Sequence, residues 1–134
     1  MSKDRTRKKK KLDREFSRYI RRVDADGNGY VKCFTCGIEK HWKEVDAGHF
    51  RSRKRLSTRW DEKNVQPQCK KCNGFNAGEQ YIFGKNLDVK YGEGTADDIT
   101  AKSFKTKKWT IAELDSMIDK YKSRNKYLDG KIGK

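Results

Sequence analysis

Four cysteines stand in two pairs, Cys33/Cys36 and Cys69/Cys72, each with a spacer of two residues. Such a spacer lets one tight turn present both thiolates of a pair, and tetrahedral zinc accepts four sulfur ligands. Between the pairs lie the 32 residues 37–68, more than the roughly 15–20 that zinc ribbons use. The pattern therefore predicts a four-cysteine zinc site with a further unit nested between its halves.

The nested unit holds residue types that could hydrolyse a phosphodiester, which requires a base, a water nucleophile and a cation near the phosphate. His49 is the candidate base, because an imidazole with a pKa near ~6.5 accepts a proton at cellular pH. Asp46 and Asn73 carry oxygen donors, which suit magnesium or manganese better than zinc. Such a reaction would use a divalent cation in addition to the zinc.

Each of these residues also has a simpler interpretation. A lone histidine beside a strand is usually structural, and an asparagine such as Asn73 is a good helix N-cap. His41 could be a second metal ligand, although a surface role fits it better. Glu79, six residues after Asn73, is a candidate for the outer surroundings of the metal.

Shortly after the histidine, the nine positions 51–59 contain five basic side chains: Arg51, Arg53, Lys54, Arg55 and Arg59. The run has no strand or helix period. We therefore expect a surface loop lying along a phosphate backbone, which fixes a strand without recognising bases. The alternative is ordinary solvated charge.

The composition favours a polyanionic partner. Lys and Arg total 34 against 19 acidic residues, a net charge of +15, which is typical of proteins that neutralise nucleic-acid phosphates. With 33% hydrophobic and 40% charged residues, the core is thin and a metal would help to stabilise it. No apolar run is long enough for a signal peptide or a membrane span, so we expect a cytoplasmic protein with reduced thiols and no membrane partner.

The flanks are predicted to be helical. Residues 1–11 are expected to form a solvated basic tail that orders only on phosphate. From residue 12 an apolar stripe formed by Leu12, Phe16, Tyr19 and Ile20 predicts a helix. The arginines of this helix lie mostly off the stripe. Near the other end, Thr95 with Asp98 and Thr110 with Glu113 predict two helix-opening capping boxes.

Shorter elements are predicted between these flanks. The segment Asp24–Tyr30 resembles the first half of a calcium loop, but Thr35 stands where a bidentate glutamate is required, so a turn between helix and strand is expected. Residues 41–50 indicate two short strands or one bent strand. A helix is expected to begin at Cys69 and to continue through Ile82, followed by a glycine loop at 92–94.

The order His49, Asn64, Asn73 resembles the HNH, or ββα-metal, nuclease motif. An asparagine directly after C-x-x-C is similar to recombination endonuclease VII of T-even phages. That likeness implies that Asn73 starts a helix facing the histidine and, with Asp46 as the candidate carboxylate, binds a catalytic magnesium or manganese ion. The resemblance also implies that Asn64 braces the loop through backbone hydrogen bonds. The sequence departs from the common pattern in one place, because Gly48 directly precedes the base and Asp46 stands three residues before it.

A wider resemblance covers residues 21–128. The order R-x-V-D, C-x-x-C-G, A-G-H-F-R, R-W, N-x-x-x-Q-C-x-x-C-N and a C-terminal amphipathic helix is similar to the NinG/Rap proteins of lambdoid phages. That resemblance implies a recombination nuclease that cuts branched DNA, including Holliday junctions and D-loops, and that works as a homodimer.

We therefore expect an α+β fold: a small zinc-stabilised HNH unit at 24–90, a basic tail and helix at 1–23, and a helical extension at 91–134. The expected function is metal-dependent DNA cleavage. Two alternatives remain open, a non-catalytic zinc module that binds nucleic acid and a sequence-specific or nicking HNH endonuclease.

Overall fold

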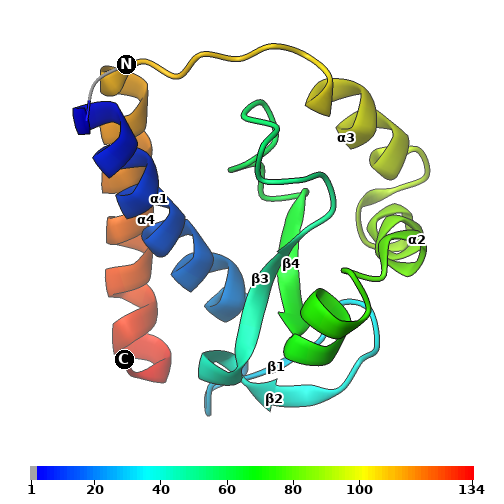
Figure 1. Cartoon of the computed structure of the whole chain (residues 1–134). Helices are drawn as coiled ribbons and strands as arrows, with labels where there is room; N and C mark the ends of the chain where they lie inside the picture. Colours follow the sequence, from blue (N-terminus) through cyan, green and yellow to red (C-terminus); the bar gives the residue numbers. More distant parts are fainter. Residues whose placement is uncertain (1–2) are drawn as a thin grey trace.

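The computed structural model describes residues 3–134 and has the expected α+β composition (Figure 1). Two antiparallel two-stranded sheets lie between a pair of long helices and a pair of shorter ones. In chain order the elements are α1 (Lys3–Arg22), β1 (Tyr30–Lys32), β2 (Glu39–His41), η1 (Trp42–Glu44), β3 (Val45–His49), β4 (Val65–Cys69), η2 (Lys71–Phe75), α2 (Gln80–Tyr91), α3 (Thr95–Ser103) and α4 (Ile111–Ile132).

The two hairpins bring the cysteine pairs together. The first pair lies in the turn that joins β1 to β2. Strand β4 ends at Cys69, which pairs with Val45 at the start of β3, and η2 continues directly from that end. A backbone hydrogen bond of 2.8 Å from the Phe34 amide to the Pro67 carbonyl ties the first turn to β4. The 41–50 segment, predicted as two short strands or one bent strand, holds only the last residue of β2, the single turn η1 and the strand β3.

The basic start of the chain is helical, which corrects the expected tail. Helix α1 begins at Lys3 and lies along α4 (Figure 1), where the Lys8 ammonium is 2.6 Å from the Asp115 carboxylate. Lysine and arginine are good helix formers, and the long partner helix gives this part of α1 a surface to follow. Residues 1 and 2 of the predicted tail lie outside the described residues.

One apolar cluster joins the helical flanks to the second hairpin. It combines side chains from α1, α4, β4 and the basic loop: Leu12, Phe16, Ile20, Trp60, Val65, Leu114, Ile118 and Tyr121. The predicted stripe on α1 is thus buried against α4. A second cluster, Phe83, Leu87 and Ile99, packs α2 against α3 with Phe34 and Phe50 on its edge. The second hairpin therefore has packed helices on both sides.

The arginines of this helix, Arg14, Arg18, Arg21 and Arg22, are predicted to lie mostly off the apolar stripe, and Arg22 is an exception. Its side chain is 0% exposed and its guanidinium bonds the Asp129 carboxylate at 2.7 Å and the Asn125 carbonyl at 2.9 Å. A buried guanidinium is tolerated because these oxygens replace its water. This polar contact fixes how α1 meets the end of α4.

Two other helix predictions are wrong in detail. The helix expected from Cys69 is divided into η2 and α2 by a turn at 76–79, where Ala77 and Glu79 have positive φ. The capping box predicted at Thr95 is absent from this part of the chain, because Gly94 is the N-cap and the Thr95 hydroxyl donates to the Gly92 carbonyl.

The other two local predictions are confirmed. Thr110 and Glu113 form the reciprocal capping box at the start of α4. Between α1 and β1, the Asp26 carboxylate accepts hydrogen bonds of 2.9 Å from the Asn28 and Tyr30 amides. That is the turn expected in place of a calcium loop.

Candidate functional site

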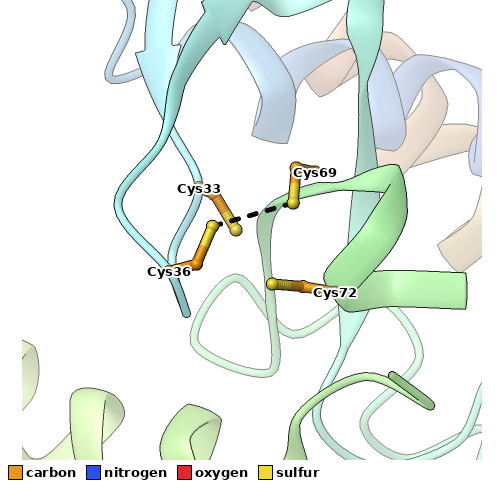
Figure 2. Close-up of side chains that lie close together, drawn as sticks. All are labelled: Cys33, Cys36, Cys69 and Cys72. Atoms are coloured by element: carbon orange, nitrogen blue, oxygen red, sulfur yellow. Dashed lines mark hydrogen bonds between the residues drawn. The ribbon is translucent and has the colours of Figure 1, made fainter. Parts of the chain in front are cut away.

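The cysteines form one compact cluster (Figure 2). Their four Sγ atoms all lie within 4.8 Å of one another, and Cys33, Cys69 and Cys72 are buried while Cys36 is exposed. The Cys36 and Cys69 sulfurs are 3.8 Å apart. Zn–S bonds of about 2.3 Å in tetrahedral geometry place sulfurs about 3.8 Å apart. The donor set and the spacing therefore fit a zinc ion.

Polar groups behind the cluster favour the thiolate of Cys33, whereas burial raises the pKa of Cys72 to about 12 in the absence of a metal. Burial raises the pKa of Cys33, but hydrogen bonds from Thr35 and from backbone amides outweigh it and lower that pKa to about 6. Gln68 donates to the Thr35 hydroxyl at 3.1 Å and to the Gly78 carbonyl at 2.9 Å, so the hydroxyl proton is directed at the Cys33 sulfur, 3.5 Å away. Such outer partners orient metal ligands.

The two predicted oxygen ligands lie side by side next to the cysteine cluster. The Asn73 amide nitrogen donates to the Asp46 carboxylate at 3.1 Å, and the Lys70 ammonium is 2.7 Å from the other carboxylate oxygen. Asp46 comes from β3, whereas Lys70 and Asn73 belong to the segment that follows β4. The pairing of Val45 with Cys69 brings these segments together.

His49 is held at the end of β3. Its Nε2 lies 3.0 Å from the Arg59 carbonyl, and because a carbonyl only accepts, Nε2 carries the proton and the Nδ1 lone pair is the basic position. Burial lowers the pKa of His49, which the Arg59 and Ala47 carbonyls oppose. The imidazole is therefore neutral at physiological pH.

His49 and Asp46 do not share a face of the strand. They are three residues apart on β3, and side chains alternate along a strand. His49 lines a cleft of about 570 Å³ between α1 and β3, together with Asp13, Arg18, Arg21, Ala47 and Arg53. Asp46 and Asn73 are not among the residues that line this cleft. Arg21 lines the cleft and is also close enough to Asp46 to feel its charge. Burial lowers the pKa of Arg21, and the negative charge of Asp46 partly opposes that shift.

Asn64 is fully buried and binds backbone on both sides of the histidine loop. Its Oδ1 accepts from the Arg51 amide at 2.7 Å, and its Nδ2 donates to the Arg51 carbonyl at 3.1 Å and to the Thr58 carbonyl at 2.9 Å. This is the geometry expected of a bracing residue. It closes the 51–64 loop next to His49.

Comparison with known proteins adds a family. A family profile described as "Bacteriophage Lambda NinG protein" matches residues 1–131. The chain belongs to the NinG family.

Its NinG relatives include three proteins named "Protein ninG", each aligned over 122 residues that make up 89% of this chain. The relative from Escherichia phage lambda is 27% identical to this chain, and those from Salmonella phage P22 and Escherichia phage 933W are each 28% identical. The aligned residues make up 56% of the lambda and P22 proteins and 57% of the 933W protein. The chain thus spans little more than half of each relative. No solved structure matches it.

In this NinG chain most arginines of the basic loop contact other parts of the protein. Arg53 and Arg59 bind the Asp13 carboxylate, at 2.8 Å and 2.5 Å. Arg51 donates to the Ser103 hydroxyl at 3.0 Å and lies over the Phe104 ring, as does Arg55. Lys54, Arg53 and Arg55 are exposed. The loop is a surface loop, as predicted, but it is tied to α1 and α3.

The two secondary candidates lie outside the Asp46–Asn73 contact. His41 Nδ1 accepts from the Lys43 amide at 3.2 Å and caps η1. Glu79 accepts from the Asn76 amide at 3.3 Å in the turn before α2.

Three contributors to the site were not found from the sequence, namely Asp13, Thr35 and Gln68. Each acts across a distance that no spacing reveals, as in the hydrogen bond from Gln68 to Thr35.

Within residues 3–134, no helix has the length and hydrophobicity needed to cross a bilayer.

Proposed function

We propose that this NinG chain is a metal-dependent DNA endonuclease of the HNH, or ββα-metal, type, which hydrolyses phosphodiesters in branched DNA such as Holliday junctions and D-loops. The observation that carries the proposal is the contact between Asp46 and Asn73. A carboxylate and an amide from two separate segments meet beside a cluster that fits zinc. The branched substrate and a homodimeric enzyme come from the family resemblance.

The Asp46–Asn73 pair is suited to a divalent cation. Rotation of the Asn73 amide presents its oxygen where the nitrogen now lies, which gives two oxygen donors side by side. Asp46 and Asn73 would hold a magnesium or manganese ion, which would supply positive charge near the scissile phosphate. The Lys70 ammonium now balances Asp46, and because Lys70 is 69% exposed, this ion pair contributes only about 0–1 kcal/mol. Lys70 is therefore free to turn toward a DNA phosphate.

In this proposal His49 is the general base. Burial keeps the imidazole neutral, and the Arg59 carbonyl fixes the tautomer that leaves Nδ1 as the proton acceptor. DNA is expected to lie along the basic loop and the α1 cleft, where Arg18, Arg21 and Arg53 gather around His49.

A second candidate function is a zinc-containing module that binds nucleic acid without cutting it. The observation that favours it is the position of His49, which bonds the Arg59 carbonyl and faces a cleft that Asp46 and Asn73 do not line. This module would keep the cysteines and the basic surface but would not depend on Asn73 or His49 for any reaction.

The deciding experiment measures cleavage and binding of a synthetic four-way junction with magnesium. Asn73→Ala and His49→Ala are expected to retain binding and lose cleavage, with a rate reduction of about 10²–10⁴-fold for the base. Asn76→Ala, in the next turn, is the matched control and should cleave like wild type. Binding without cleavage by all four proteins, wild type included, would favour the binding module. Equal cleavage rates on the junction and its linear arms would favour the sequence-specific or nicking enzyme.

A further inference from the structure

An aromatic side chain stands almost fully in solvent beside the Asp46–Asn73 contact. Phe75 is 93% exposed and follows Asn73 by two residues at the end of η2, the short green helical turn next to β4 in Figure 1. Leaving a phenylalanine in water forgoes the free energy that burial of its ring would gain. A partner that covers the ring would recover this free energy.

The backbone around Phe75 is held rigidly. The Asn76 amide donates to the Lys71 carbonyl at 2.8 Å and the Gly78 amide to the Cys72 carbonyl at 2.8 Å. Gln68 fixes the same turn from the core through the Gly78 carbonyl. Two residues of the turn, Ala77 and Glu79, keep positive φ, which surrounding contacts must maintain against a backbone cost. The exposed ring is therefore presented on a fixed turn anchored to a cysteine of the cluster.

The surroundings of Phe75 favour a polyanion over a protein surface. Lys70 and Lys71 are exposed at the start of the same turn, and the chain carries a net charge of +15. Nucleic-acid bases offer a π-face that stacks on aromatic rings, while lysines bind the adjacent phosphates. The Cα atoms of Asn73 and Phe75 can be at most about 7 Å apart, which is about two base steps along a strand.

We infer that Phe75 stacks on an unpaired base beside the phosphate that a cation at Asp46 and Asn73 would bind. The residue would thereby select DNA with unstacked or unpaired nucleotides, as found at a branch point. The position of the base relative to a cut site rests on the proposed function, whereas the stacking requires only that the chain binds DNA.

The test uses the full chain with magnesium omitted, so that no cleavage is involved. A duplex with a three-nucleotide bulge that contains 2-aminopurine is compared with the same duplex fully paired. Binding is followed by fluorescence anisotropy and stacking by quenching of the 2-aminopurine. Wild type is expected to bind the bulged duplex more tightly and to quench its fluorescence. In Phe75→Ala the ratio of affinities for the bulged and the paired duplex should fall about tenfold, and the quenching should be lost. Phe75→Trp should restore both.

Tyr127→Ala is the matched control, because Tyr127 is a 70% exposed aromatic on a different element, α4. It should behave like wild type. Quenching by Phe75→Ala equal to wild type, or an equal loss of affinity for both duplexes, would overturn the inference. So would a loss of self-association in Phe75→Ala during analytical ultracentrifugation, which would make Phe75 a protein contact. A wild type that stacks but never cleaves would overturn only the proposed function.

Discussion

At the scale of single residues, buried polar side chains hold this small protein in register. Three of the polar side chains that are 0% exposed are Arg22, Asn64 and Gln68. Each donates a hydrogen bond to a backbone carbonyl of another segment of the chain. Buried polar groups are costly unless they are bonded. Removing any one of them should therefore cost more than removing an exposed residue of the same type.

Arg22→Ala should lower the free energy of unfolding by about 3–5 kcal/mol, because Asp129 would lose its 2.7 Å partner at the end of α4 and a buried space would remain. Chemical denaturation measures this change. Arg14→Ala, on an exposed position of the same helix, is the control and should stay within about 0.5 kcal/mol of wild type. Similar losses for the two variants would contradict the role assigned to Arg22.

Gly48 is required because the Gln68 side chain occupies the space of a Cβ atom. A Cβ built at Gly48 would lie 1.9 Å from the Gln68 Oε1. Gly48→Ala should therefore lower the free energy of unfolding by about 1–3 kcal/mol. In a Gln68→Ala background the same change should cost much less, since the space is then open. Additive losses in thermal denaturation would show that the contact is not the cause.

At the scale of elements, the two hairpins depend on the cysteine cluster. Strands β1 and β2 have three residues each, and an isolated two-stranded hairpin of this size is marginally stable in water. The cluster joins their turn to the end of β4 (Figure 2). A bound zinc would therefore fasten one sheet to the other and also fix η2, which carries Asn73.

Zinc removal should consequently unfold the hairpins first. Cys72→Ser is expected to reduce the zinc content from about one ion per chain and to lower the melting temperature, as should a strong chelator added to wild type. Elemental analysis and thermal denaturation under reducing conditions measure both. Ser123→Cys adds a thiol on the exposed face of α4 and should change neither quantity. Wild-type protein that is purified metal-free and melts as a folded domain would contradict the zinc assignment.

At the scale of the whole molecule, the apolar cluster between α1, α4 and the second hairpin makes one structure of the segments predicted as separate parts. Its border includes the cleft that holds His49. The charge state of that histidine therefore bears on the stability of the entire fold.

The pH dependence of stability follows from the lowered pKa of His49, which burial causes. In the unfolded chain His49 binds a proton near its ordinary pKa of 6.5, whereas in the folded chain it does so only at lower pH. The contribution of His49 to the free energy of unfolding is therefore fully present above pH 6.5 and decreases as the pH falls below that value. Denaturation of wild type between pH 5 and 8 measures this decrease. His49→Gln should show a flatter dependence in that window, and an unchanged slope would contradict the assignment.

The sequence by itself determined the cysteine cluster, the α+β class, the stripe on α1 and the capping box at Thr110. These follow from spacings within a turn or a helix, where local geometry sets which side chains meet. The resemblance to HNH nucleases also made Asp46 and Asn73 candidate ligands of one cation, and their side chains are in contact. Whether a cation binds between them remains a prediction.

Only the tertiary structure decided the burial of Arg22, the break between η2 and α2, and the cleft into which His49 turns. The burial of Arg22 and the cleft depend on contacts between segments far apart in the chain, such as Arg22 with Asp129 and Arg53 with Asp13. Such contacts leave no period or spacing in the sequence, because packing and desolvation are properties of the assembled core. Local chemistry therefore predicted which groups are present, and long-range packing decided which of them face one another.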